Sequence, residues 1–163
     1  MVDYHTVRPE EISLLFRDDN QVDIFPPLIL TLGEWRQPKT YLTVRSVLPL
    51  PDGSATYTVS CKNVPLLSFL HDLYMKCETW TATNGKGRPL LKFLAVSGSE
   101  MVFPIHTDST VRVWRCSSPF RVVPTEPKIS VGDRLILAAR LVGIVGVTTW
   151  SLAIETQDIM IME

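Results

Sequence analysis

The chain has 163 residues, of which 45% are apolar and 20% are charged. This length suits one domain with a core of its own, and the composition excludes a disordered chain. Cys61, Cys77 and Cys116 are isolated, which excludes a disulfide framework and indicates reduced thiols. The opening residues MVDYHTVRPEE are polar where a signal peptide would be apolar, and no stretch is long and apolar enough to span a bilayer.

The net charge of −1 conceals an uneven distribution. Residues 1–34 carry a net charge of −5, residues 35–140 carry +7 and residues 141–163 carry −3. A basic body between acidic ends predicts a polyanionic partner, such as a nucleoprotein, RNA or an anionic membrane surface. It also suggests that the acidic end of one subunit docks on the body of another. The alternative is scattered surface charge that serves only solubility.

The first 38 residues show little periodicity. Glu10 to Phe16 allow one helical turn at most, and Phe25-Pro26-Pro27 breaks any helix and favours an extended path. Residues 1–38 are therefore predicted to form a flexible or extended N-terminal arm, and residues 39–163 a globular core. An arm of this kind predicts that residues 36–163 fold without it.

A β-hairpin and one helix are predicted next. Lys39–Val47 and Thr56–Cys61 alternate as strands do, and the Pro-Asp-Gly sequence between them is typical of a turn. Asn63 is a good helix N-cap with Pro65 in the first turn. Apolar residues then recur at steps of three and four up to Trp80, which predicts a helix over residues 64–80.

The remaining residues read mostly as strands. Leu90–Ser97 is predicted to be a central strand, and Thr110–Cys116 a further one. Met101–Ile105 is interrupted by a proline and fits an apolar loop as well as a strand. Residues 117–132 read mostly as loop, and two further strands are predicted over residues 134–142 and 147–155, with DIMIME as a short last one. The fold class is thus α+β: a single domain with an antiparallel sheet of about six strands packed with one main helix.

No catalytic pattern stands out. A phosphate-binding loop needs Gly-x-x-x-x-Gly-Lys-Ser/Thr between a strand and a helix, whereas Gly85-Lys86-Gly87-Arg88-Pro89 follows a helix and precedes a strand. The three histidines have no partners at metal-ligand spacing, and no serine lies in a nucleophile elbow. The sequence therefore predicts a non-enzyme without a metal or cofactor. An enzyme whose site is assembled from distant residues stays an open alternative.

The remaining candidate for a functional site is a surface of basic and apolar residues. Two groups of basic residues follow the helix: Lys86, Arg88 and Lys92 in a turn and its strand, and Arg112, Arg115 and Arg121 further on. Basic residues beside an exposed apolar loop suit an anionic bilayer, because the charges attract and the loop inserts. The loop consists of Met101, Val102, Phe103, Pro104 and Ile105. It could equally plug a neighbouring subunit, or its side chains could fill the core.

The order of these features resembles the matrix proteins of rhabdoviruses, above all the vesiculovirus type. In that family a Thr-Val-Lys strand leads to a helix, a Gly-Lys-Arg-Pro turn and a strand that ends in Gly-Ser. The positions that match here are Arg88-Pro89, Lys92, Leu94-Ala95 and Gly98-Ser99. The resemblance covers residues 39–106, and more weakly the strand around Arg134–Ile144.

The resemblance implies a small structural protein that coats the inner face of a viral envelope, condenses the nucleocapsid and drives budding. It implies head-to-tail homo-oligomers in which the arm of one subunit docks on the next, and further contacts with viral nucleoprotein–RNA, an anionic membrane and the viral glycoprotein tail. The host cytoplasm, the inner face of the virion envelope and the host nucleus are the implied locations. The docking residues of the arm would be Phe25, Pro26, Pro27, Leu28 and Trp35.

The chain also departs from the family. Its start is acidic where members often carry a lysine-rich segment, and Phe25-Pro26-Pro27-Leu28-Ile29 lacks the tyrosine of the Pro-Pro-x-Tyr budding motif. The alternative function is a viral RNA-binding accessory protein, of the silencing-suppressor or movement-protein type. In that case Trp114 on a basic strand would stack with bases.

Overall fold

The computed structural model describes residues 2–51, 55–92, 95–97, 100–107, 110–117, 121–125 and 128–163; for residues 95–97 and 100–107 it describes the backbone alone. The described residues form one α-helix and a single sheet of eleven strands, in which parallel and antiparallel pairs are mixed. The α+β class is confirmed in broad terms, whereas the expectation of about six strands is too low.

The elements follow one another along the chain with three short 3₁₀ helices, at Tyr4–Thr6, Pro9–Glu11 and Pro38–Thr40. The α-helix is α1, Val64–Asn84. The strands are β1 (Val2–Asp3), β2 (Ser13–Asp18), β3 (Gln21–Leu32), β4 (Leu42–Pro49), β5 (Ala55–Cys61), β6 (Ala95–Ser97), β7 (Glu100–Thr107), β8 (Arg112–Ser117), β9 (Arg121–Pro124), β10 (Arg134–Val145) and β11 (Ser151–Met162).

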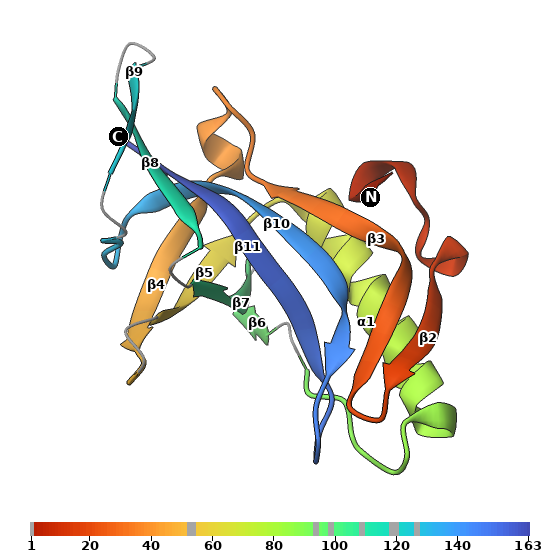
Figure 1. Cartoon of the computed structure of the whole chain (residues 1–163). Helices are drawn as coiled ribbons and strands as arrows, with labels where there is room; N and C mark the ends of the chain where they lie inside the picture. The colour runs from red at the N-terminus through yellow and green to blue at the C-terminus, as the bar shows by residue number, and fades with distance from the viewer. Residues whose placement is uncertain are drawn as a thin grey trace.

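Strand β10 is the centre of the sheet, and it is the point where the sheet branches (Figure 1). The strand order is β6-β7-β5-β4-β10-β11-β8-β9, and β3 also pairs with β10 and carries β1 and β2. One edge of β10 therefore serves two strands. Leu135 of β10 lies opposite Leu42 of β4, and Leu137 lies opposite Leu32 of β3.

The predicted hairpin over β4 and β5 is confirmed. The two strands pair antiparallel, with Val44 opposite Val59. Alternation places Leu42 and Val44 of β4, and Val59 and Cys61 of β5, in the core, as period-two patterning requires.

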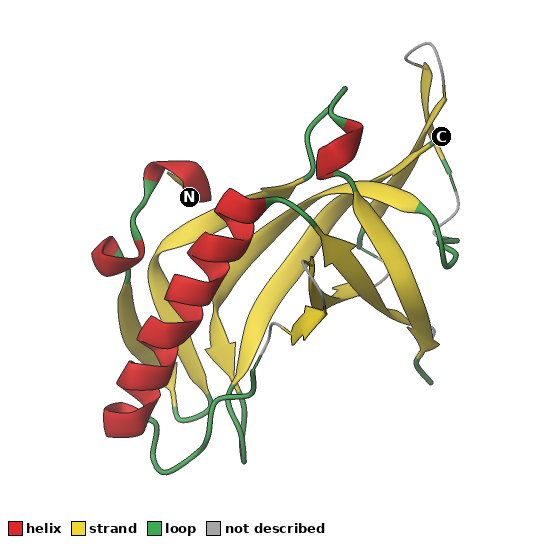
Figure 2. Ribbon diagram, turned by 180° about the vertical axis from the view of Figure 1, so that it is seen from behind, coloured by secondary structure: helices red, strands yellow, loops and turns green. Residues whose placement is uncertain are grey.

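The predicted helix is confirmed and runs one turn further than expected, to Asn84. Asn63 caps it: its side-chain oxygen accepts a hydrogen bond from the Leu66 N–H, and Gly85 follows at the C-terminal end. Figure 2 shows α1 lying across one face of the sheet, over β3 and β10. Its buried side chains recur at helical spacing and join the core: Leu66, Leu67, Phe69, Leu70, Leu73 and Cys77.

The cap at Asn63 gives a first testable prediction. Asn63→Ala removes the acceptor for one N–H group of the first helical turn, so we expect the free energy of unfolding to fall by about 1 kcal/mol. Asn63→Asp keeps an acceptor and should stay close to the native value. Urea unfolding followed by far-UV circular dichroism measures both, and equal stability of the Ala and Asp variants would contradict the capping role.

The segment predicted to be an arm is built into the sheet. Strand β3 pairs with β10 over most of its length, and its side chains Val22, Leu28, Leu30 and Leu32 are fully buried. Pro26 and Pro27 do not interrupt the strand, because the β3–β10 ladder skips from Leu28 to Asp23. At that irregularity neither strand needs the proline N–H groups, so their absence costs no hydrogen bond.

Two further predictions differ from the structure, and residues 101–105, for which a loop and a strand were both open, form a strand. Residues 90–97 are not a central strand: Leu90 forms an isolated bridge with Trp150, and β6, which covers only residues 95–97, lies at the end of the strand order. Residues 101–105 lie within β7, which pairs with β5, and so do not form a loop. The last strand is one element, β11, of 12 residues, where two short strands were expected.

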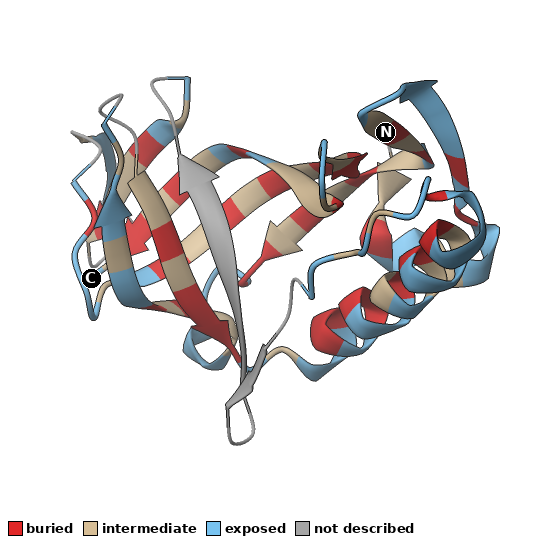
Figure 3. Cartoon of the chain, turned by 90° about the horizontal axis from the view of Figure 1, so that it is seen from below, coloured by how far each residue is buried: buried red, intermediate tan, exposed pale blue. Residues whose placement is uncertain are grey.

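The core lies between α1 and the sheet, and the sheet curves far enough that β7 approaches β11 without pairing with it. Buried and partly buried residues alternate along β10 and its neighbours (Figure 3). We call the side of the sheet that faces away from this core the outer face. Residues Arg134, Ile136 and Ala138 of β10 belong to it, because Leu135, Leu137 and Ala139 between them are buried.

Candidate functional site

The basic turn, which was predicted to contact a partner, contacts other residues of the same chain. Lys86 donates to the Asp19 carboxylate at 2.6 Å, and its ammonium lies 5.0 Å from the ring centre of Phe16. This hydrogen bond from Lys86 holds the pKa of the exposed Asp19 carboxyl below its ordinary value. The acidic N-terminal region is thus a partner of the basic turn within one subunit.

Arg88 is fixed in the same way. It donates to the backbone carbonyls of Asp19 and Gly146, each at 2.8 Å, and its guanidinium lies 4.9 Å from the ring centre of Trp150. Trp150 is fully buried and donates to the Gly85 carbonyl at 3.0 Å. The basic loop, residues 85–92, therefore joins the end of α1 to the β2–β3 and β10–β11 turns.

The other four basic residues that were predicted to contact a partner do not lie in one cluster with Lys86 and Arg88. Lys92 is exposed at the last position of the basic loop, and Arg121 is exposed at the start of β9. Arg112 forms an ion pair with Asp158 at 2.9 Å, and Arg115 one with Glu163 at 3.1 Å. The basic loop and the β8–β9 hairpin lie at different ends of the molecule in Figure 1. The structure thus does not assemble the six basic residues into one surface.

The remaining predicted residues are dispersed as well. Leu28 is in the core, Phe25 is exposed, Pro26 and Pro27 are half-buried, and Trp35 is just exposed in the loop between β3 and β4. The side chains of Met101, Val102, Phe103, Pro104 and Ile105 lie outside the described residues, so their role in self-association or membrane contact stays a prediction.

A different cationic cluster forms on the outer face, where β10, β4 and β5 run side by side. Arg134, Thr43 and Ser60 form one cross-strand row in which Thr43 lies opposite both of the others. A pocket of about 520 Å³ opens over this row. We call it the cationic pocket; it is lined by Pro38, Lys39, Tyr41, Thr43, Arg45, Ser60, Lys62 and Arg134.

Local contacts hold the walls of the cationic pocket in place. The Arg134 guanidinium lies 5.0 Å from the ring centre of Tyr41, and Arg45 Nε donates to Ser60 Oγ at 3.0 Å. On the third side, the Thr40 hydroxyl accepts from the Glu34 N–H and donates to the Gln37 carbonyl, both at 2.7 Å. These bonds fix the loop that carries Lys39.

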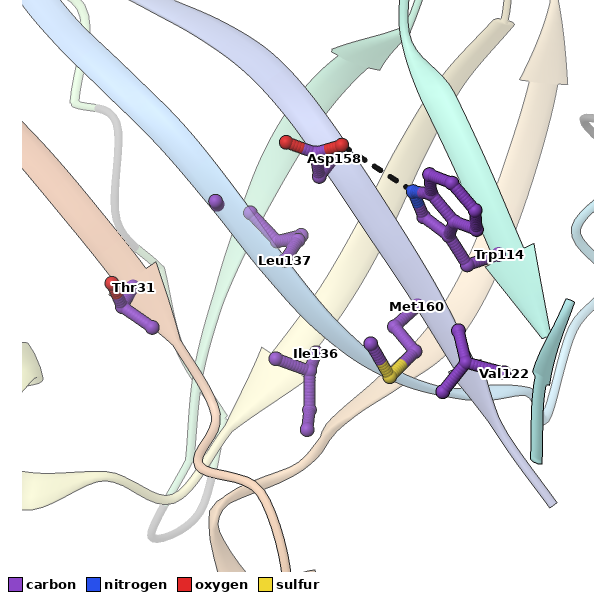
Figure 4. A pocket seen from close by; sticks show the side chains of 8 residues that line it. Thr31, Trp114, Val122, Ile136, Leu137, Asp158 and Met160 are labelled. Atoms are coloured by element: carbon purple, nitrogen blue, oxygen red, sulfur yellow. Dashed lines mark hydrogen bonds between the residues drawn. The ribbon is translucent and has the colours of Figure 1, made fainter. Parts of the chain in front are cut away.

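An apolar hollow lies further along the same face of β10. It has a volume of about 350 Å³, and Figure 4 shows the side chains that line it, from β3, β10, β11, β8 and β9. We use the name apolar hollow for the space lined by Thr31, Trp114, Val122, Ile136, Leu137, Ala138, Asp158 and Met160.

One carboxylate lies at the rim of the apolar hollow. Asp158 accepts from Trp114 Nε1 at 3.4 Å, drawn in Figure 4, and is paired with Arg112. These two contacts leave the indole half-buried against the sheet. On the next part of the face, Arg140 of β10 is paired with Glu155 of β11. The described charged side chains around the apolar hollow are thus paired with one another.

The sequence contains part of the signal for the cationic pocket. Lys39, Tyr41, Thr43 and Arg45 are spaced by two along the strand segment KTYLTVRSV, which places alternate side chains on one face. Arg134 could not be added from the sequence, because its place beside Thr43 depends on the branched pairing of β10.

Comparison with known proteins gave no relative. A scan against protein-family models found no match, and searches of curated proteins and of solved structures found none either. Within the part of the chain that the structure describes, no three His, Cys, Asp or Glu side chains are grouped as metal ligands would be. No described helix has the length and apolar character needed to cross a bilayer.

Proposed function

We propose that this chain is a non-enzymatic structural protein of the viral matrix type, which lies on an anionic membrane through its outer face. The observation that carries the proposal is the position of the cationic pocket beside the apolar hollow, at Arg134 and Ile136 of one strand. Each Lys or Arg close to an anionic leaflet contributes about 1 kcal/mol of attraction. The apolar hollow can receive the end of an acyl chain.

The resemblance to rhabdovirus matrix proteins supports the same class of function, although the residues that carry it are not those of the cationic pocket. Self-association belongs to the proposal, but not by a detached arm, because β1, β2 and β3 of the N-terminal region belong to the sheet. A better candidate surface is β9, an edge strand whose four residues are exposed. Edge strands offer unpaired backbone groups to a second chain.

The RNA-binding alternative receives less support. Trp114 is half-buried, and its N–H faces the Asp158 carboxylate, which would repel a phosphate backbone. A stacking role would need the ring to be accessible beside free cations, and Arg112 on the same strand is paired with that same Asp158.

Flotation with vesicles of phosphatidylserine and phosphatidylcholine tests the proposal. Lys39→Glu removes one attractive charge and adds a repulsive one, so we expect membrane affinity to fall by about 2 kcal/mol, or roughly 30-fold. Arg8→Glu makes the same change of charge on an exposed side chain at the N-cap of the 3₁₀ helix Pro9–Glu11, which lies near α1 and away from the outer face, and should leave flotation close to native.

A second pair of variants tests the apolar hollow. Val122→Glu places a carboxylate at its wall, whereas Val64→Glu places one at the exposed first turn of α1, where an acidic residue is favourable. We expect weaker flotation only for Val122→Glu. Equal flotation of the native chain with anionic and neutral vesicles, or equal loss in all four variants, would refute the proposal.

A further inference from the structure

We propose that the cationic pocket is a binding site for a phosphomonoester group, carried either by a lipid headgroup or by a small soluble molecule. This goes beyond attraction to a charged surface, since it assigns a defined ligand class to a defined site. A volume of about 520 Å³ lies in the range of roughly 300–1,000 Å³ that is typical of small-molecule pockets.

The charge of the lining selects an anion. Four of its eight residues are basic, and no carboxylate belongs to the described lining. A single carboxylate ligand would need one cation, whereas a phosphomonoester carries a charge of about −1.5 to −2 at neutral pH and offers three strong acceptor oxygens. The two lining cations Lys39 and Arg134 match that higher charge.

The donors also have the right shape. Guanidinium groups bind phosphate oxygens through two parallel N–H bonds, and Arg134 is held by stacking on Tyr41, so its orientation is set before a ligand arrives. Lysine adds a compact charge from the ordered loop at Lys39. Ser60 and Thr43 supply hydroxyl groups at the floor of the site, because they lie opposite each other on adjacent strands.

Isothermal titration of the full chain with inositol 1,4,5-trisphosphate tests the site without any membrane. We expect binding by the native chain, a loss of about tenfold or more in affinity for Arg134→Gln and for Lys39→Gln, and an intermediate loss for Arg134→Lys, which keeps the charge but not the fork. Inositol should not bind. Arg8→Gln serves as the matched control and should bind as the native chain does.

Vesicles then identify the source of the group. Phosphatidic acid carries a phosphomonoester and phosphatidylserine a phosphodiester, so preference for phosphatidic acid that is lost in Arg134→Gln indicates a lipid ligand. Binding of the trisphosphate without that preference indicates a soluble one, and either result supports the site. The inference is overturned if the trisphosphate does not bind. It is also overturned if Arg134→Gln and Lys39→Gln bind the trisphosphate as tightly as the native chain, or if single-stranded RNA binds to the pocket and the trisphosphate does not displace it.

The outcomes of the two proposals are separable. If the trisphosphate binds at the cationic pocket while the chain ignores all vesicles, the membrane function fails and the phosphomonoester site stands. If the chain binds anionic vesicles but does not bind the trisphosphate, the membrane function stands and the site fails.

Discussion

Removal of residues 1–35 is expected to abolish cooperative folding of the rest of the chain. The truncation takes away β3, with five side chains that are almost or fully buried: Val22, Ile24, Leu28, Leu30 and Leu32. Each contributes about 1.5–3 kcal/mol, so together they supply roughly 7–15 kcal/mol. That sum is as large as the whole stability of a typical domain, about 5–15 kcal/mol. The opposite expectation, a folded core without an arm, followed from the sequence.

Near-UV circular dichroism and thermal unfolding of residues 36–163 measure this effect. Two point variants of the full chain control for the loss of chain length: Leu30→Asp places a charge in the core, and Thr31→Asp places one on the outer face of the same strand. We expect Leu30→Asp to resemble the truncation and Thr31→Asp to fold. A cooperative thermal transition in the truncated chain would show that β3 is dispensable.

Replacement of Trp150 by alanine is expected to have the second-largest effect, a loss of about 3–5 kcal/mol in the free energy of unfolding. The indole is fully buried, packs 6.2 Å from the ring of Phe16 and lies under Arg88. Its removal leaves a cavity and frees the carbonyl of Gly85 from its hydrogen bond. The basic loop would lose the side chain that contacts both Gly85 and Arg88.

Trp150→Phe is the matched control, because it keeps a ring beneath Arg88 but cannot donate to Gly85. We expect it to lose about 1–3 kcal/mol, the cost of an unsatisfied buried acceptor. Urea unfolding of the three proteins gives the differences directly. If the alanine variant stays within about 1 kcal/mol of the native chain, the indole is not the anchor of this loop.

The elements that the sequence predicted well are those specified by local chemistry. The N-cap at Asn63, the apolar spacing of α1 and the alternation of the β4–β5 hairpin each depend on residues close in sequence. They form as predicted because local preference and tertiary packing agree there.

The elements that were missed depend on distant partners. Proline at positions 26 and 27 argues against a strand unless the irregular β3–β10 ladder is known, and that ladder joins residues more than 100 positions apart. In the same way, Lys86 and Arg88 look like a free basic surface until Asp19 and Trp150 are placed against them. The cationic pocket needed both kinds of information, a local pattern in β4 and a distant residue, Arg134.

The shared edge of β10 also orders events while the chain is being made. At about 5–20 residues per second, β10 leaves the ribosome roughly 5–20 s after β3 and β4, the two strands that need it. During that interval the edge of β3 that pairs with β10 has no partner strand, and such an apolar edge is prone to aggregate. Its two central prolines cannot join a continuous ladder with another chain. We infer that they limit pairing of β3 with other chains until β10 has been synthesised.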